Sequence, residues 1–173
     1  MIIVLLRGIN VGGHKKLPMA DLRRWLGEAG LGEVKTYIQS GNVLVPGDRD
    51  PAEVGEVVKA TIAAQTGFDV PVVACTSARW KALLAANPFP AGEDRQVHLG
   101  LPTADGPIDE LAELATADFG DERLVVGDDA VWMHTPNGMG RSKMAVKVSR
   151  KAGDRLTFRN RRTLEKLLAM AEG

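Results

Sequence analysis

The residue types best suited to binding chemistry are concentrated in residues 6–16. This stretch reads LRGINVGGHKK, so three glycines and four basic side chains directly follow an apolar run. Glycine allows backbone conformations and close approaches that other residues forbid. Exposed amides beside arginine and lysine can cradle a phosphate or carboxylate. We therefore predict an anion-binding loop. The alternative is that the loop only connects elements across the edge of a sheet, with glycines that allow its turns and charged side chains that keep it soluble.

This loop is not a nucleotide-binding P-loop. Gly8 and Gly13 fit that glycine spacing, but His14 and Lys15 stand where the motif requires Lys and then Ser or Thr. The next helix is expected to begin only at Pro18, so the glycines do not lie on its first turn. If the protein is an enzyme, His14 is the side chain best placed to act as a general acid or base. The sequence leaves open whether a reaction is catalysed and names no cofactor.

A second polar segment, residues 137–143, contains Arg141, Ser142 and Lys143. Ser142 is expected to cap a helix whose amino end binds an anion with help from the two cations. The alternative is a glycine turn followed by an ordinary N-cap. The histidines match no metal-ligand spacing, so no metal site is predicted.

The positioning elements follow from periodicity and from capping residues. In the first half we expect a strand over 1–6, a helix from Pro18, a hairpin of strands 34–38 and 43–45, a helix capped by Asp50, a strand over 70–75 and a helix capped by Ser77. Gly41 is the expected positive-φ residue of the hairpin turn. In the second half we expect a strand over 96–101, a helix over 108–115, a hairpin of 123–126 and 131–134, a helix over 142–151, a strand over 155–158 and a final helix capped by Asn160.

Each half thus reads βαββαβ followed by one more helix. We predict an α+β fold of two ferredoxin-like units, related by structural duplication, that span residues 1–87 and 96–173 with a linker over 88–95. Such a unit has an antiparallel sheet of spatial order 4-1-3-2. This order would place Arg7, Asn10 and the glycine loop beside the turn that carries Gln39, Ser40 and Asn42.

Composition narrows the class of protein. The chain has 173 residues, 45% of them hydrophobic and 25% charged, as expected of a globular protein. Its single cysteine, Cys75, excludes an internal disulfide and favours a reducing compartment; we expect a small core residue there. No apolar run approaches the roughly 18 residues of a membrane span, so a cytoplasmic protein without membrane partners is expected.

The charge is unevenly distributed although the net charge is zero. Residues 46–140 carry six Lys/Arg against sixteen Asp/Glu, whereas residues 141–173 carry ten against three. A basic terminal segment of this kind suits a nucleic acid or another anionic partner. The alternative is that the two segments neutralise each other in the fold.

Several segments resemble the bacterial family catalogued as domain of unknown function 1697. They are residues 6–13, 37–42, 87–89, 140–143 and 159–160. The resemblance implies a small cytosolic bacterial protein with a fold related to paired ferredoxin-like units, and it implies no established activity. One departure is that Arg161 and Arg162 follow Asn160 where the family usually has an aromatic residue, so ligand stacking by that aromatic is not expected here.

We therefore expect a phosphate-bearing small molecule, such as a nucleotide, as the ligand. The predicted ligand-binding residues, which include most of the family's motif positions, are Arg7, Gly8, Asn10, Gly12, Gly13, Lys15, Gln39, Ser40, Asn42, Arg141, Ser142, Lys143, Arg159 and Asn160. Two other functions stay open: nucleic-acid binding through the basic terminal segment, and protein interaction without catalysis. The oligomeric state does not follow from the sequence.

Overall fold

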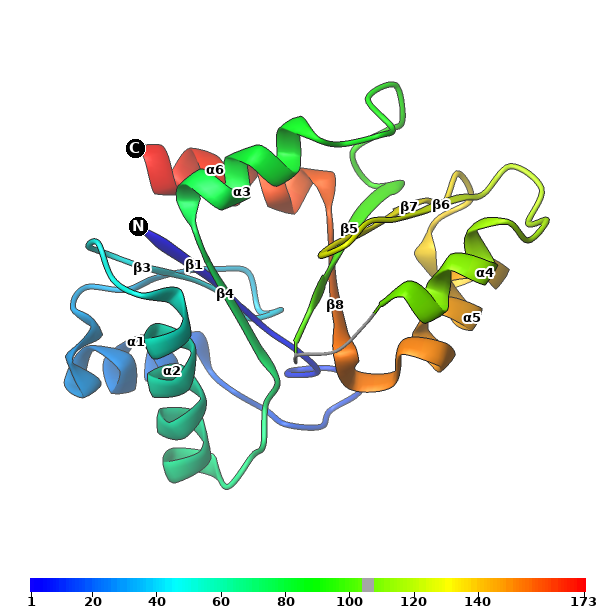
Figure 1. The fold of residues 1–173 in the computed structure, drawn as a ribbon. Coiled ribbons are helices and arrows are strands. Elements are labelled where there is room, and N and C mark those ends of the chain that lie inside the picture. Colours follow the sequence, from blue (N-terminus) through cyan, green and yellow to red (C-terminus); the bar gives the residue numbers. More distant parts are fainter. Residues whose placement is uncertain (104–107) are drawn as a thin grey trace. The chain divides into compact units, whose positions relative to one another are not determined.

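A computed structural model describes residues 1–103 and 108–173 of the chain (Figure 1). The chain is an α+β protein that divides into two units. The first unit comprises residues 1–83 and 167–173, and the second comprises residues 84–166. Each unit contains one four-stranded antiparallel sheet. Among the described helices, none combines the length and the apolar character that crossing a membrane requires.

The first unit alternates strands and helices. In chain order it contains β1 (Ile2–Leu6), α1 (Met19–Leu26), η1 (Gly27–Leu31), β2 (Lys35–Tyr37), β3 (Asn42–Val45), α2 (Pro51–Thr66), β4 (Val72–Thr76) and α3 (Ser77–Ala85). The label η marks short helical segments that are not α-helical: η1 is a π-helical turn, and η2 to η4 of the second unit are 3-10 helices. The boundary between the units falls within α3, at residue 83.

The first sheet is built around β1. Its strand order is β2-β3-β1-β4, so β1 pairs antiparallel with both β3 and β4. Every residue of β1 is at most 1% exposed, which agrees with its continuous apolar sequence. Helices α1 and α2 cover one face of this sheet (Figure 1), and their buried stripes include Leu22, Leu26, Val54 and Val58. The core of the unit therefore lies between β1 and these two helices.

The turn between β2 and β3 depends on Gly41. Its carbonyl accepts a hydrogen bond from the amide of Leu6, the last residue of β1, at 2.8 Å. Gly41 has φ 80°, as predicted, and a Cβ atom there would lie 2.7 Å from the Leu6 Cβ and 2.8 Å from the Cδ1 of Ile9. Both the backbone angle and the lack of space therefore require glycine.

The sequence predicts two helix caps in this unit, Asp50 and Ser77. Asp50 caps α2 as predicted, because its Oδ1 accepts from the Ala52 amide at 2.8 Å. The prediction that Ser77 caps α3 was wrong by one residue. The Oγ1 of Thr76 accepts from the Arg79 amide at 3.1 Å, so the last residue of β4 provides the cap.

The second unit begins within α3 and ends within the final helix. Its elements are β5 (Val97–Pro102), η2 (Asp109–Leu111), α4 (Ala112–Ala115), β6 (Arg123–Val126), β7 (Val131–His134), η3 (Met139–Arg141), α5 (Lys143–Ala152), η4 (Gly153–Arg155), β8 (Leu156–Asn160) and the start of α6 (Arg161–Glu172). Residues 167–173, the end of α6 and the last residue, belong to the first unit.

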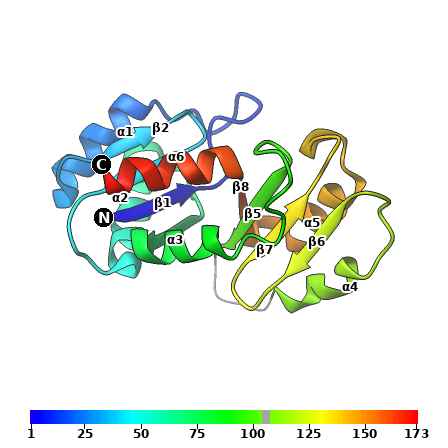
Figure 2. The same ribbon diagram turned by 90° about the horizontal axis from the view of Figure 1, so that it is seen from above.

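The second sheet has the order β6-β7-β5-β8, with β5 between β7 and β8 (Figure 2). Counted by each unit's own strands, both sheets therefore share the order 2-3-1-4, which is 4-1-3-2 from the opposite edge. Gly100 of β5 lies opposite Phe158 of β8, and a Cβ atom at Gly100 would lie 2.3 Å from the Phe158 ring. The ring thus covers the space that glycine leaves, an arrangement that stabilises glycine within a sheet.

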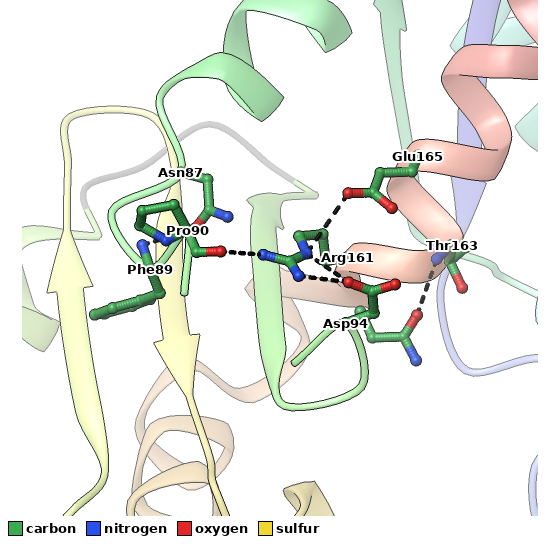
Figure 3. Close-up of polar contacts among 8 residues, drawn as sticks. Asn87, Phe89, Pro90, Asp94, Arg161, Thr163 and Glu165 are labelled. Atoms are coloured by element: carbon green, nitrogen blue, oxygen red, sulfur yellow. Dashed lines mark hydrogen bonds and ion pairs between the residues drawn. The ribbon is translucent and has the colours of Figure 1, made fainter. Parts of the chain in front are cut away.

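Residues 88–95, expected as a linker, form an ordered loop of the second unit. The loop contacts the start of α6 through Arg161 (Figure 3). Its guanidinium donates to the Asp94 carboxylate at 2.8 and 2.5 Å and to the Pro90 carbonyl at 3.0 Å. The Arg161 Nε also lies 3.5 Å from an Oε1 atom of Glu165. The division of the chain thus differs from the expected one, since the boundary precedes this loop and the end of α6 joins the first unit.

We predict that Gly41→Ala destabilises the protein by about 2–5 kcal/mol. The left-handed conformation costs a residue with a Cβ about 1–2 kcal/mol, and the overlap with Leu6 and Ile9 adds about 1–3 kcal/mol. Gly67→Ala is the control, because Gly67 has φ 71° with nothing within 4 Å of a Cβ, and it should lose only the backbone contribution. Urea unfolding measures both; equal losses would show that the crowding has no effect.

We also predict that Arg161→Ala lowers the free energy of unfolding by about 1–2 kcal/mol, because it removes charged hydrogen bonds from a largely buried guanidinium. Arg162→Ala is the matched control. The Arg162 side chain is exposed, so its removal should change stability by less than about 0.5 kcal/mol. Urea unfolding measures both variants. Equal losses of stability would show that the hydrogen bonds of Arg161 to the loop do not stabilise the protein.

Candidate functional site

The loop between β1 and α1 forms a short hairpin of its own. At its turn, residues 11–14, the amide of His14 donates to the carbonyl of Val11 at 3.0 Å. Gly12 and Gly13 have φ values of 57° and 80°, the two positive angles that a type I′ turn requires. All four residues of the turn are exposed. The turn therefore faces solvent with its backbone as well as its side chains.

Asn10 ties the base of this hairpin to two other parts of the first unit. Its amide donates to the Lys15 carbonyl at 3.2 Å. Its side-chain Nδ2 donates to the carbonyls of Leu17 and Gln39, both at 2.9 Å, and its Oδ1 accepts from the Leu17 amide at 2.8 Å. The φ of Asn10 is 53°, in a region that asparagine tolerates better than most residues. One carboxamide thus holds the loop against the β2–β3 turn.

The β2–β3 turn contributes exposed and buried side chains to this end of the sheet. Gln39 and Ser40 are exposed. Asn42 is fully buried, and its Nδ2 donates to a backbone carbonyl of β2 at 2.9 Å and to the Ser40 Oγ at 3.1 Å. Asn42 therefore maintains the turn, while Gln39 and Ser40 expose polar side chains to solvent.

Four basic side chains lie on or next to the hairpin. His14 and Lys16 are exposed, whereas Arg7 and Lys15 are half-buried. The Nζ of Lys15 donates to the Asp69 carbonyl, just before β4, at 2.5 Å. The structure thus brings nine of the predicted residues to one end of the first sheet: Arg7, Gly8, Asn10, Gly12, Gly13, Lys15, Gln39, Ser40 and Asn42.

The other five predicted residues lie in the second unit, in two separate segments. Ser142 caps α5 as predicted, with its Oγ accepting from an amide three residues later at 2.8 Å. The amide of Met144 donates to the Glu122 carboxylate at 3.0 Å. A carboxylate of the chain itself therefore occupies the helix amino end, where the sequence predicts an external anion. The sequence gives no signal for this contact, because Glu122 lies far from the start of α5 along the chain.

Arg141 and Lys143 line a groove of about 530 Å³ beside this helix end. The other lining residues are Asp118, Phe119, Gly120, Asp121, Glu122 and Asn137. Three carboxylates thus share the groove with two cations. This mixture of charges does not favour an anion over a cation.

Arg159 and Asn160 end β8 at the edge of the second sheet, and both serve the fold. Arg159 donates to the Thr157 Oγ1 at 3.1 Å and to the Phe158 carbonyl at 2.8 Å. Burial lowers the pKa of the Arg159 guanidinium to about 10. The Oδ1 of Asn160 caps α6 as predicted, because it accepts from the Thr163 amide at 3.0 Å.

The basic terminal segment does not form one uninterrupted basic surface. Three of its cations pair with carboxylates from the acidic segment before it: Lys151 with Glu113, Arg155 with Glu110, and Arg161 with Asp94. Burial removes Arg159 as well. Mutual neutralisation, one of the two alternatives left open by the sequence, therefore accounts for the three paired cations. A nucleic acid would have fewer charges to bind.

Cys75 and the other two histidines, His98 and His134, lie on strands. Burial raises the pKa of the Cys75 thiol to about 12, so this cysteine is protonated and unreactive at neutral pH. His98 is 7% exposed on β5, with Nδ1 3.2 Å from the Gln96 carbonyl. The His134 ring packs against Phe89, with ring centroids 5.6 Å apart. Within residues 1–103 and 108–173, no three His, Cys, Asp or Glu side chains are grouped to hold a metal ion.

We predict that His98 makes the protein less stable in mild acid. Burial lowers the pKa of the His98 imidazole below its usual value, so the unfolded chain binds the proton more tightly. The stability is full above the unfolded pKa of about 6.5 and falls as the pH drops towards the folded pKa. His98→Gln should therefore lose less stability than the wild type between pH 7.5 and 5.5 in urea unfolding. Equal losses of stability in His98→Gln and in the wild type would contradict the assignment of this acid sensitivity to His98.

The chain resembles a solved structure over nearly its whole length. That structure is described as "the structure of conserved bacterial protein SP0830 from Streptococcus pneumoniae". The TM-score is 0.77 at 23% sequence identity, and the alignment covers 98% of this chain and 97% of that one. At this identity the likeness concerns the fold. Among curated proteins, no match to the chain was found.

A family model described as "Protein of unknown function (DUF1697)" matches residues 1–132. The match includes β1, the glycine hairpin and the β2–β3 turn, and it ends within β7. It therefore confirms the family that the motifs suggested. Because the model covers well over half of the sequence, this chain belongs to the DUF1697 family.

Proposed function

We propose that the protein binds an anionic small molecule, a nucleotide or another phosphorylated metabolite, at the hairpin of residues 7–16. The observation that carries the proposal is the hydrogen bond from Asn10 Nδ2 to the Gln39 carbonyl. It holds the glycine turn and the polar β2–β3 turn together before any ligand binds. A prearranged site loses less conformational entropy on binding than a flexible loop does.

The donors at the hairpin suit a phosphate. Among the described residues, no carbonyl accepts a hydrogen bond from the amides of Gly12 or Gly13, and both residues are exposed. His14 and Lys16 add exposed donors on the same loop, and no described carboxylate pairs with either. Backbone amides together with cationic side chains form charge-assisted hydrogen bonds to phosphate oxygens. In this proposal Arg7, Gln39 and Ser40 border the ligand, and Asn10 and Asn42 support them.

The proposal extends to the architecture. We propose that both units are ferredoxin-like and arose by structural duplication, each followed by one extra helix. The shared strand order of the two sheets supports this, since βαββαβ units with right-handed crossovers give that order. A cytoplasmic location is part of the same proposal, and the single cysteine with its buried thiol supports it.

Thermal shift measurements with inorganic phosphate, pyrophosphate, AMP and ATP test the binding proposal. An anion at about 100 times its dissociation constant should add roughly 2.7 kcal/mol to the free energy of unfolding. His14→Gln combined with Lys16→Gln should weaken binding about tenfold or more, because neutral carboxamides replace side chains that can form charge-assisted hydrogen bonds to phosphate.

The matched control is Arg162→Gln combined with Lys166→Gln, which removes two exposed cations from the second unit. This variant should bind the anion as the wild type does. A panel on which no anion raises the melting temperature would refute the proposal. Equal weakening in both double variants would point to non-specific charge, and tight, steeply salt-dependent binding of DNA or RNA would favour the nucleic-acid alternative.

A further inference from the structure

Two apolar side chains are exposed at this end of the first sheet. Val11 is 66% exposed in the hairpin turn, and Ile38 is 50% exposed in the β2–β3 turn. Each is the chain neighbour of a residue in the Asn10–Gln39 hydrogen bond. The donors of the proposed anion site and two of the most exposed large apolar side chains of the described structure therefore belong to the same pair of turns.

The conformation of Ile38 is unfavourable for folding. Its φ is 48°, in the left-handed region where a β-branched side chain is a genuine outlier. Glycine or asparagine would adopt this angle at lower cost. Because half of the Ile38 side chain is exposed, burial in the core does little to offset the strain. A contact between the Ile38 side chain and a bound ligand would explain why an apolar residue occupies this position.

We infer that the ligand of this site carries a flat apolar group beside its phosphate, so that a nucleotide binds more tightly than a sugar phosphate. This inference rests on the proposed anion-binding function. The phosphate contacts the amides of Gly12 and Gly13 with His14 and Lys16, and the base covers Val11 and Ile38. Covering both side chains removes apolar surface from water, which adds affinity that inorganic phosphate and sugar phosphates lack.

Isothermal titration with AMP and ribose 5-phosphate tests the inference, because the two ligands share the phosphate and the ribose and differ in the base. We expect AMP to bind about tenfold more tightly to the wild type. Val11→Ser combined with Ile38→Asn should bring AMP to the affinity of ribose 5-phosphate and leave ribose 5-phosphate unchanged. Ile38→Asn alone should raise the melting temperature by about 2–4 °C, since it relieves the strain, and this shows that the variant is folded.

The outcomes separate the two proposals. Equal binding of AMP and ribose 5-phosphate to the wild type would overturn the inference and leave the anion site in place. Weakening of both ligands to the same degree in the double variant would also overturn it, because the apolar side chains would then act on the phosphate or on the loop. If neither ligand binds at millimolar concentration, the anion site fails and the inference fails with it. Val125→Ser combined with Val146→Ser, which removes the exposed apolar residues of the second unit, is the matched control and should leave both affinities unchanged.

Discussion

The first unit depends on the contacts that join the end of β1 to the β2–β3 turn. The Leu6 amide donates to Gly41, and the Asn10 carboxamide spans from Leu17 to Gln39. Together they set where the glycine hairpin emerges and which of its groups face solvent. Because β1 is buried on both faces, its end cannot shift without disturbing the core. The hairpin thus follows a fully buried strand, and a loop that is placed on such an element is held precisely.

Charge has a different role in the second unit. The acidic segment and the basic segment that follows it pair with each other, in ion pairs such as Arg161–Asp94 and Lys151–Glu113. Glu122 adds a carboxylate at the amino end of α5. Part of the opposite charge of these two segments is therefore neutralised locally. Cations used in this way position loops and helices, and they are less accessible to a polyanion.

Strand positions and helix caps were largely predictable, because they depend on neighbours in the sequence. Asp50, Ser142 and Asn160 cap the predicted helices, and Gly41 has the predicted positive φ. The wrong cap at Ser77 is a shift of one residue, since threonine and serine are adjacent there and both can cap. The convergence of the hairpin and the β2–β3 turn was also predictable, because it follows from strand order. The burial of Asn42 was not, since an asparagine in a turn can point inwards or outwards.

The sequence by itself determined the family, the elements and the residues of the glycine hairpin, because motifs and periodicity are local properties of the chain. Only the tertiary structure decided which polar residues are accessible. It buried Asn42, partly buried Arg159, gave the amino end of α5 to Glu122, and used Arg161 to order a loop that composition alone marked as a linker. These outcomes depend on pairs of residues far apart in the sequence, and such pairs are set by the packing of strands and helices. Whether a polar side chain supports the fold or faces a ligand is therefore decided by its distant neighbours.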